Sequence, residues 1–286
     1  MIRRLCIIGV GLIGGSLARA LRQAGYVQEI VGSSRRVEHL QEAVELGVID
    51  RFDIDAARAV QGADMIVVCV PLGAMEQTFR SIAPTLAPDA VVTDAGSAKA
   101  RVVAAARAAL GARLSCFVPG HPIAGTEKSG VAASFAELYR NRKVILTPLA
   151  ETDPAATARV QTMWETVGAQ VQCMGVEHHD EVLAATSHLP HVLAFQMVDT
   201  LARMSDEDEI FRYAAGGFRD FTRIASSDPV MWRDICLAND RAVLLMLERY
   251  QQDLSRLAEA IRAGDGVELE RVFRNAKAAR DRHSER

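Results

Sequence analysis

Short apolar runs alternate with helical stretches through about residue 174. The runs are rich in β-branched residues, whereas the stretches between them carry apolar residues at helical spacing. We expect strands near residues 4–8, 29–32, 64–70, 90–94, 115–118, 143–146 and 169–173. Helices are expected near residues 16–25, 75–86 and 98–110. This alternation predicts an α/β fold, with a mostly parallel sheet and helices on both of its faces.

After Gly175 the pattern changes to long helical periodicity, and we expect helices over residues 181–204, 208–218, 230–263 and 266–282. The change predicts two domains, residues 1–174 and an all-helical part over residues 175–286. An apolar stripe follows the third of these helices, and part of it is expected to form a dimer interface, with core packing as the alternative. The stripe contains Leu237, Leu244, Leu245, Leu247, Leu254, Leu257 and Ile261.

A glycine motif joins the first predicted strand to the first predicted helix. In this G-x-G-x-x-G sequence Gly9 makes the tight turn, Gly11 lets the backbone approach a pyrophosphate, and Gly14 lets the helix pack on the strand. The motif predicts a Rossmann dinucleotide-binding domain for a nicotinamide or flavin nucleotide. A secretory signal peptide cleaved after Ala18-Arg19-Ala20 is the alternative, but cleavage would remove this loop.

The end of the second predicted strand bears on the choice of nucleotide. It lacks the acidic residue that binds the adenosine ribose 2′-hydroxyl, and Ser33, Ser34, Arg35 and Arg36 follow instead. Hydroxyls and guanidiniums suit a 2′-phosphate, so we expect NADP over NAD, unless the two arginines simply open the next helix. The expected cofactor contacts are Gly9, Gly11, Leu12, Ile13, Gly14, Ser33, Ser34, Arg35, Val70 and Pro71.

Composition argues against several classes of binding partner. The 286 residues carry a net charge of −3, which gives no global attraction to nucleic acid, and no apolar run is long enough to span a membrane. Five cysteines without C-x-x-C spacing indicate free, mostly buried thiols in a reducing cytoplasm. His178, His179, Asp180, His188 and His191 lack the spacing of a known metal motif, so no metal is expected.

Polar residues gather beside glycines and prolines in three places. His121 lies in the segment Gly120–Glu127, which we expect to be a rigid loop, and it is a candidate general base or else a structural histidine. Ser187–His191 forms a second cluster. In the third, Arg219 and Arg223 are one helical turn apart and could bind a carboxylate or pair with neighbouring acids.

Together these motifs resemble the prephenate/arogenate dehydrogenase family of tyrosine biosynthesis. The N-terminal glycine loop and the segments 94–99, 121–127, 187–191 and 217–223 occur in the family's order over nearly the whole chain. The resemblance implies a Rossmann domain followed by a helical domain through which two subunits form a homodimer. It also implies an active site between the two domains.

The resemblance implies roles for individual residues. His121 would accept the proton of the substrate's ring hydroxyl, and Ser97 would hydrogen-bond to that hydroxyl and to the histidine. Arg223 would bind the substrate, and His191 would act as the hydrogen-bond donor found in members that use prephenate. Further positions that shape or gate the pocket would be Glu127, Gly216, Asp220 and Trp232.

The implied reaction is the NAD(P)-dependent oxidative decarboxylation of prephenate to 4-hydroxyphenylpyruvate, with arogenate, which gives tyrosine, as a further substrate. Such a reaction needs a base, a carboxylate-binding group and an aligned cofactor. Two other classes of protein stay open at this point. One is a two-domain NAD(P)-dependent dehydrogenase for a β-hydroxy acid or an imine, and the other is a nucleotide-sensing protein without catalysis.

Overall fold

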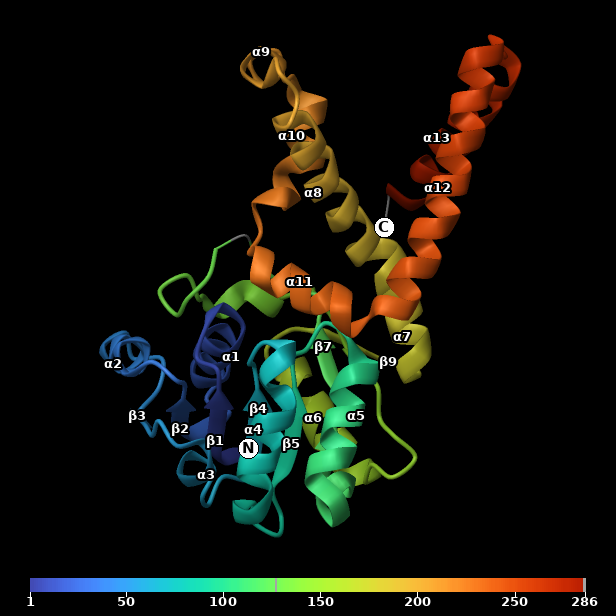
Figure 1. The fold of residues 1–286 in the computed structure, drawn as a ribbon. Helices are drawn as coiled ribbons and strands as arrows, with labels where there is room; N and C mark the ends of the chain where they lie inside the picture. The colour runs from blue at the N-terminus through green and yellow to red at the C-terminus, as the bar shows by residue number, and fades with distance from the viewer. Residues whose placement is uncertain (127, 285–286) are drawn as a thin grey trace. The chain divides into compact units, whose positions relative to one another are not determined.

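The computed structural model describes residues 1–126 and 128–284. It divides into two compact units, Met1–Asp240 and Arg241–Arg286, and each is considered by itself. Within the described residues, no helix combines the length and the apolar character needed to span a bilayer. Figure 1 shows the course of the chain.

The N-terminal sheet has six parallel strands in the order β3-β2-β1-β4-β5-β6. The strand order reverses between β1 and β4, and ligands of open α/β sheets bind at such a reversal, beyond the carboxyl ends of the strands. The predicted parallel sheet is therefore confirmed, although the two-residue strand β3 was missed. The strands are β1 (Ile2–Ile8), β2 (Val27–Ser33), β3 (Arg51–Phe52), β4 (Met65–Val68), β5 (Val91–Asp94) and β6 (Phe117–Val118).

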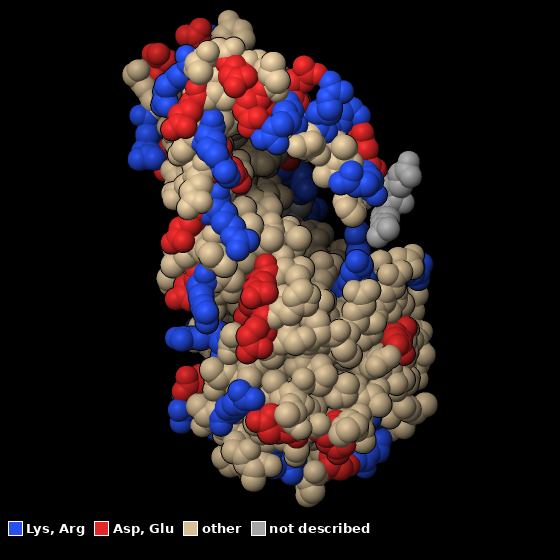
Figure 2. All heavy atoms as spheres, turned by 90° about the vertical axis from the view of Figure 1, so that its right-hand side faces the viewer, with Lys and Arg blue, Asp and Glu red and all other residues tan. Residues whose placement is uncertain are grey.

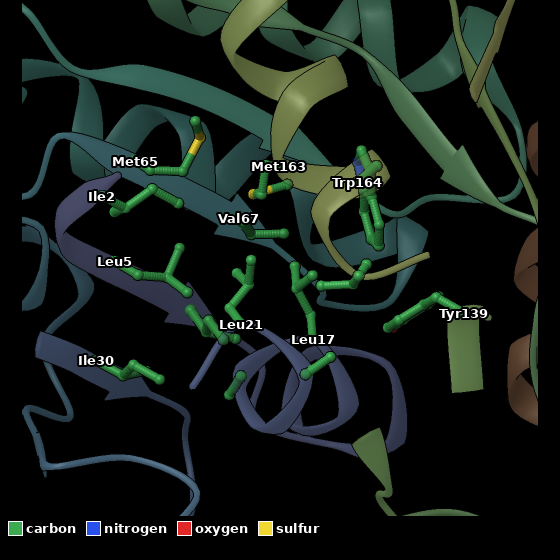
Figure 3. Close-up of a cluster of buried hydrophobic side chains, with 14 of the residues drawn as sticks. Ile2, Leu5, Leu17, Leu21, Ile30, Met65, Val67, Tyr139, Met163 and Trp164 are labelled. Carbon is green, nitrogen blue, oxygen red and sulfur yellow. The ribbon is translucent and has the colours of Figure 1, made fainter. Parts of the chain in front are cut away.

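Helices cover both faces of this sheet, because its central strands are apolar on both sides. On one face Leu17 and Leu21 of α1 pack with Leu5 of β1, and Met163 and Trp164 of α6 belong to the same cluster (Figure 3). The other face is covered mainly by α4 and α5. These helices are α1 (Leu12–Gln23), α2 (Val37–Glu45), α3 (Ala56–Ala59), α4 (Met75–Ile82), α5 (Lys99–Leu110) and α6 (Pro154–Thr166).

A second, three-stranded sheet has the order β7-β8-β9, formed by Gly120–Pro122, Lys143–Leu146 and Gln170–Cys173. His121 therefore lies in an edge strand, where it pairs with Ile145 across an antiparallel ladder. The expectation of a loop at residues 120–122 was wrong. Three residues are too short to show strand alternation, and a proline is tolerated in an edge strand.

The chain after Cys173 is helical, but the expected helix over residues 181–204 is interrupted. A π-helical turn, Ala184–His188, separates α7 (Val176–Leu183) from α8 (Leu189–Ala202). Pro190 lacks the N–H that would bond to the carbonyl of Thr186, so regular α-helix cannot run through this point. The remaining helices of this unit are α9 (Glu207–Arg212), α10 (Gly216–Thr222) and α11 (Pro229–Ala238), with a 3₁₀ turn at Arg223–Ser226.

The unit Arg241–Arg286 contains most of α12 (Asp240–Ala263) and all of α13 (Gly266–Ser284). The single helix expected over residues 230–263 is thus broken at Asn239, between α11 and α12. Several members of the predicted stripe are more than 45% exposed, and they are Leu237, Leu244, Leu245, Leu254 and Ile261.

Charged side chains of both signs are mixed on the one face that Figure 2 shows. On the face shown in Figure 2, Lys and Arg are interspersed with Asp and Glu, so that face carries no large basic patch of the kind that binds nucleic acid. All five cysteines are free, as expected. Only Cys6 is fully buried, however, and Cys173 is exposed because it ends the edge strand β9, so the expectation of mostly buried thiols was wrong.

Candidate active site

The glycine loop has the geometry that its sequence predicts. Gly9 has φ +96° and lies against the carbonyl of Cys69, so a side chain here would be strained and would collide with backbone. A Cβ atom on Gly14 would lie 2.6 Å from the Gly9 oxygen and from Cγ2 of Ile7, so only glycine lets α1 approach β1 this closely. A Cβ atom on Gly11, by contrast, would meet no atom within 4 Å. The backbone at Gly11 is therefore open to a ligand.

The loop fits the pyrophosphate of a dinucleotide. Helix α1 has no side-chain cap and no acidic residue in its first turn, so its first N–H groups, among them those of Leu12 and Ile13, are available to an anion. At the end of β2, Ser33 is buried, Ser34 is half-buried and Arg35 is exposed. Val70 and Pro71 follow β4, whose carboxyl end lies at the same edge of the sheet.

A cavity of about 380 Å³ begins at this loop. Gly11, Ser97, His121, His188 and Trp232 are among the residues that line it. A second cavity, of about 770 Å³, also contains His121 and Trp232 and extends to His191 and Arg223. His121 therefore lines both the cavity that begins at the glycine loop and the cavity that contains Arg223.

His121 is almost fully buried and is the first member of a hydrogen-bonded chain. Its Nδ1 lies 2.9 Å from Nε2 of His179, and Nδ1 of His179 lies 2.8 Å from Oδ1 of Asp180. Nε2 of His121 makes no hydrogen bond within the described chain, although the ring lines both cavities. A hydrogen bond between Ser97 and His121, which the family resemblance implied, is likewise not formed among the described residues, although both residues line the smaller cavity.

A buried ion pair lies behind His121. Nζ of Lys99 lies 2.5 Å from Oδ2 of Asp94 and donates to the carbonyl of Gly120, which precedes His121 in β7. Both charged side chains are completely buried. Burial, followed by the Lys99 charge and then the two histidines His179 and His188, lowers the pKa of His121 well below its usual 6.5. His121 is therefore neutral at neutral pH and can act as a base.

His188 is held in one tautomer by its neighbours. The side-chain amide of Asn239 donates one hydrogen bond to the carbonyl of Asp180 and another to Nδ1 of His188. Burial lowers the pKa of His188 to about 4, so the neutral ring carries its proton on Nε2. That nitrogen and Nε1 of Trp232 have no partner in the described chain, which leaves two donors at residues that line the smaller cavity.

His191 stacks on Trp232, with ring centroids 3.6 Å apart, and its Nδ1 donates to the carbonyl of Ser187. Burial lowers the pKa of His191, so the neutral ring presents an unprotonated Nε2. The expectation that His191 acts as a donor therefore fails for the neutral ring, which can only accept a hydrogen bond. It would donate only after protonation.

The remaining sequence-predicted residues are more scattered. Arg223 begins the 3₁₀ turn after α10, is exposed, and reaches the larger cavity. Gly216 and Asp220 are exposed and line neither of the two cavities. Glu127 lies outside the described residues.

Sequence reasoning missed four contributors to the site, which are Lys99, His179, Asp180 and Asn239. The residues His179 and Asp180 were considered only for metal binding. Their link to His121 spans 58 positions, and a single sequence contains no signal for a contact of that range.

A six-stranded Rossmann sheet with a buried histidine beside its glycine loop defines a dinucleotide-dependent oxidoreductase. Comparison with known proteins specifies the family. Residues 17–173 match the prephenate dehydrogenase nucleotide-binding domain, and residues 175–275 match the prephenate dehydrogenase dimerization domain. The chain belongs to the prephenate dehydrogenase family.

Relatives match along almost the whole chain. A cyclohexadienyl dehydrogenase of Zymomonas mobilis is 40% identical over 97% of this chain and 95% of its own. A prephenate dehydrogenase of Bacillus subtilis is 35% identical over 97% of this chain and 75% of its own. The solved structure of prephenate dehydrogenase from A. aeolicus, in complex with hydroxyphenyl propionate and NAD+, superimposes with a TM-score of 0.92 at 40% identity. That match covers 99% of this chain and 98% of the other.

Proposed function

We propose that this protein catalyses the NAD(P)-dependent oxidative decarboxylation of prephenate to 4-hydroxyphenylpyruvate in tyrosine biosynthesis. The observation that carries the proposal is the placement of His121. It is buried and neutral, its Nδ1 is bonded to His179, and its unbonded Nε2 belongs to a ring that lines a cavity shared with the glycine loop. Family membership and the names of the relatives support the same reaction.

In the proposed reaction, Nε2 of His121 takes the proton of the ring hydroxyl, and Ser97 orients that hydroxyl from the same cavity. The glycine loop Gly9–Gly14 would hold the dinucleotide, and a bound nicotinamide would supply the hydride acceptor for the carbon that bears the hydroxyl. Arg223 holds a substrate carboxylate in the larger cavity. His191 lines the larger cavity beside Trp232 and would complete the substrate pocket.

Comparison of kcat/KM for prephenate and arogenate, at saturating cofactor, tests the substrate assignment. We expect turnover of prephenate, with arogenate as a secondary substrate. Neutral His191 can accept a hydrogen bond from the ammonium group that distinguishes arogenate from prephenate, and this supports arogenate as a further substrate. If the enzyme turned over neither prephenate nor arogenate, the proposal would be overturned.

Replacement of Arg223 by alanine is expected to raise KM for prephenate by about 30- to 900-fold. This range corresponds to the loss of about 2–4 kcal/mol from a charge-assisted carboxylate contact. The Kd of the cofactor should stay near the wild-type value, because Arg223 lines only the larger cavity. Steady-state kinetics of Arg223→Ala, with the exposed Arg212→Ala as control, checks this. Loss of folding without a separable kinetic defect would identify Arg223 as structural instead.

For the cofactor, we propose a preference for NADP over NAD. Support comes from the sequence Ser33-Ser34-Arg35 at the end of β2, which lacks an acidic residue. The A. aeolicus relative was solved with NAD+. The two proteins would therefore bind different groups at the 2′ position of the adenosine ribose, a hydroxyl in the relative and a phosphate here. We expect Arg35→Ala to lower kcat/KM for NADP while that for NAD changes little. A wild-type preference for NAD, or an NADP preference that survives the substitution, would show that Arg35 does not bind the 2′-phosphate.

We also propose that the chain acts as a homodimer, with a nucleotide-binding domain over residues 1–174 and a helical domain for dimerisation and substrate binding over residues 175–286. Exposed apolar side chains on α12, such as Leu244, Leu245 and Ile261, support a partner surface on that helix. The proposed location is the cytoplasm, which supplies the cofactor and keeps thiols such as those of the five free cysteines reduced.

A further inference from the structure

The chain from His121 through His179 to Asp180 joins three elements that are distant in sequence. His121 comes from β7, and His179 and Asp180 come from α7. Asp180 in turn binds the start of α5, since its Oδ1 accepts from the backbone N–H of Lys99 at 2.7 Å and its Oδ2 accepts from that of Ala100 at 2.8 Å. These are N–H groups of the first helical turn, which have no partner inside the helix. Both oxygens of Asp180 are therefore fixed.

Of the three hydrogen-bonded residues His121, His179 and Asp180, only Asp180 has a fixed role, because an ionised carboxylate can accept hydrogen bonds but cannot donate them. Burial raises its pKa, but the hydrogen bonds from His179, Lys99 and Ala100 outweigh burial and lower the pKa overall, so Asp180 is ionised. Nδ1 of His179 must then carry a proton and donate to Asp180. In neutral His179 the other nitrogen, Nε2, is consequently an acceptor.

This assignment propagates to His121. If Nε2 of His179 accepts, Nδ1 of His121 must carry the proton and donate it across the 2.9 Å contact. Neutral His121 then has its lone pair on Nε2, the nitrogen without a hydrogen-bond partner in the described chain. We propose that His179 and Asp180 are positioning residues that hold His121 in the tautomer with a basic Nε2. This inference rests on the proposed role of His121 as the base.

Other ionisable groups also surround the His121 ring. Lys99 on α5 opposes a positive charge on His121, the rings of His179 and His188 lie near it as well, and Asp94 is already paired with Lys99. Among the described residues, Asp180 is the one carboxylate that is hydrogen-bonded to His121 through another side chain.

The protonation state can be read without any substrate. In the ¹⁵N spectrum of histidine-labelled enzyme at neutral pH, with His121 signals assigned by their loss in His121→Asn, we expect a protonated Nδ1 and an unprotonated Nε2. The opposite tautomer, or a charged ring, would overturn the inference. Since this measurement does not depend on turnover, its failure is distinguishable from failure of the proposed function.

Two substitutions at His179 separate positioning from packing. His179→Gln retains an oxygen that can accept from Nδ1 of His121, whereas His179→Phe fills the space without an acceptor. We expect His179→Phe to lower kcat by about 10²-fold or more, with KM and cofactor Kd near wild type, and His179→Gln to recover a large part of the loss. The neighbouring, exposed His178→Gln is the matched control. Unchanged kcat in His179→Phe, or equal loss of kcat in both His179 variants, would contradict the assignment.

Discussion

Replacement of His121 by asparagine is expected to lower kcat for prephenate by about 10²–10⁴, the usual contribution of a positioned general base. Asparagine keeps a polar side chain in β7 but cannot take a proton at the position of Nε2. The cofactor should still bind with near wild-type Kd, because the glycine loop and the end of β2 are untouched. His39→Asn, on α2 away from both cavities, serves as the control. A variant with near wild-type kcat would remove His121 from the proposed role.

The pH dependence of kcat/KM provides a second test of His121 as the base. His121 must be neutral to accept a proton, and burial together with the Lys99 charge lowers its pKa below 6.5. Activity should therefore be present at neutral pH and be lost only as the pH falls through that lowered value. We expect the acid limb of kcat/KM to lie below pH 6.5 and to disappear in His121→Asn. An acid limb that stays in place in the variant would belong to another group.

Replacement of Lys99 by methionine is expected to destabilise the fold by about 3–5 kcal/mol, because it leaves Asp94 as an unpaired charge in the interior. The amine also loses its hydrogen bond to Gly120, so the strand that carries His121 is weakened. Denaturant unfolding measures the effect, with the exposed Lys143→Met as the control. The double variant Lys99→Met with Asp94→Asn should recover part of the lost unfolding free energy, since no unpaired charge then remains. Unfolding of Lys99→Met at the wild-type denaturant concentration would contradict this role.

The Rossmann half of the molecule could be predicted because its signals are local. Buried parallel strands are continuous apolar runs, and Gly9 and Gly14 are required by a turn and a close approach within a few residues of them. Elements that depend on distant partners could not be predicted in this way. The strand at Gly120–Pro122 exists only because β8 pairs with it, and the π-helical turn before Pro190 gives no periodicity of its own.

The candidate site likewise contains residues that could be predicted from the sequence and residues that could not. The resemblance to a family selected His121, Ser97, Arg223 and Trp232 in advance, and all four line one or both cavities. The atoms that decide the protonation of His121 lie on α5 and α7, and only the folded chain brings them together. For His191 the sequence suggested a donor, whereas the carbonyl of Ser187 fixes its proton on the nitrogen away from a ligand.

The central claim is that the chain couples oxidation of a cyclohexadienyl alcohol to loss of its ring carboxylate. The most direct test is the stoichiometry of a complete reaction with purified enzyme, prephenate and excess cofactor. We predict one reduced nicotinamide, one CO₂ and one 4-hydroxyphenylpyruvate for each prephenate consumed. Reduction of the nicotinamide without release of CO₂, or no consumption of prephenate above the rate in the absence of enzyme, would contradict the account.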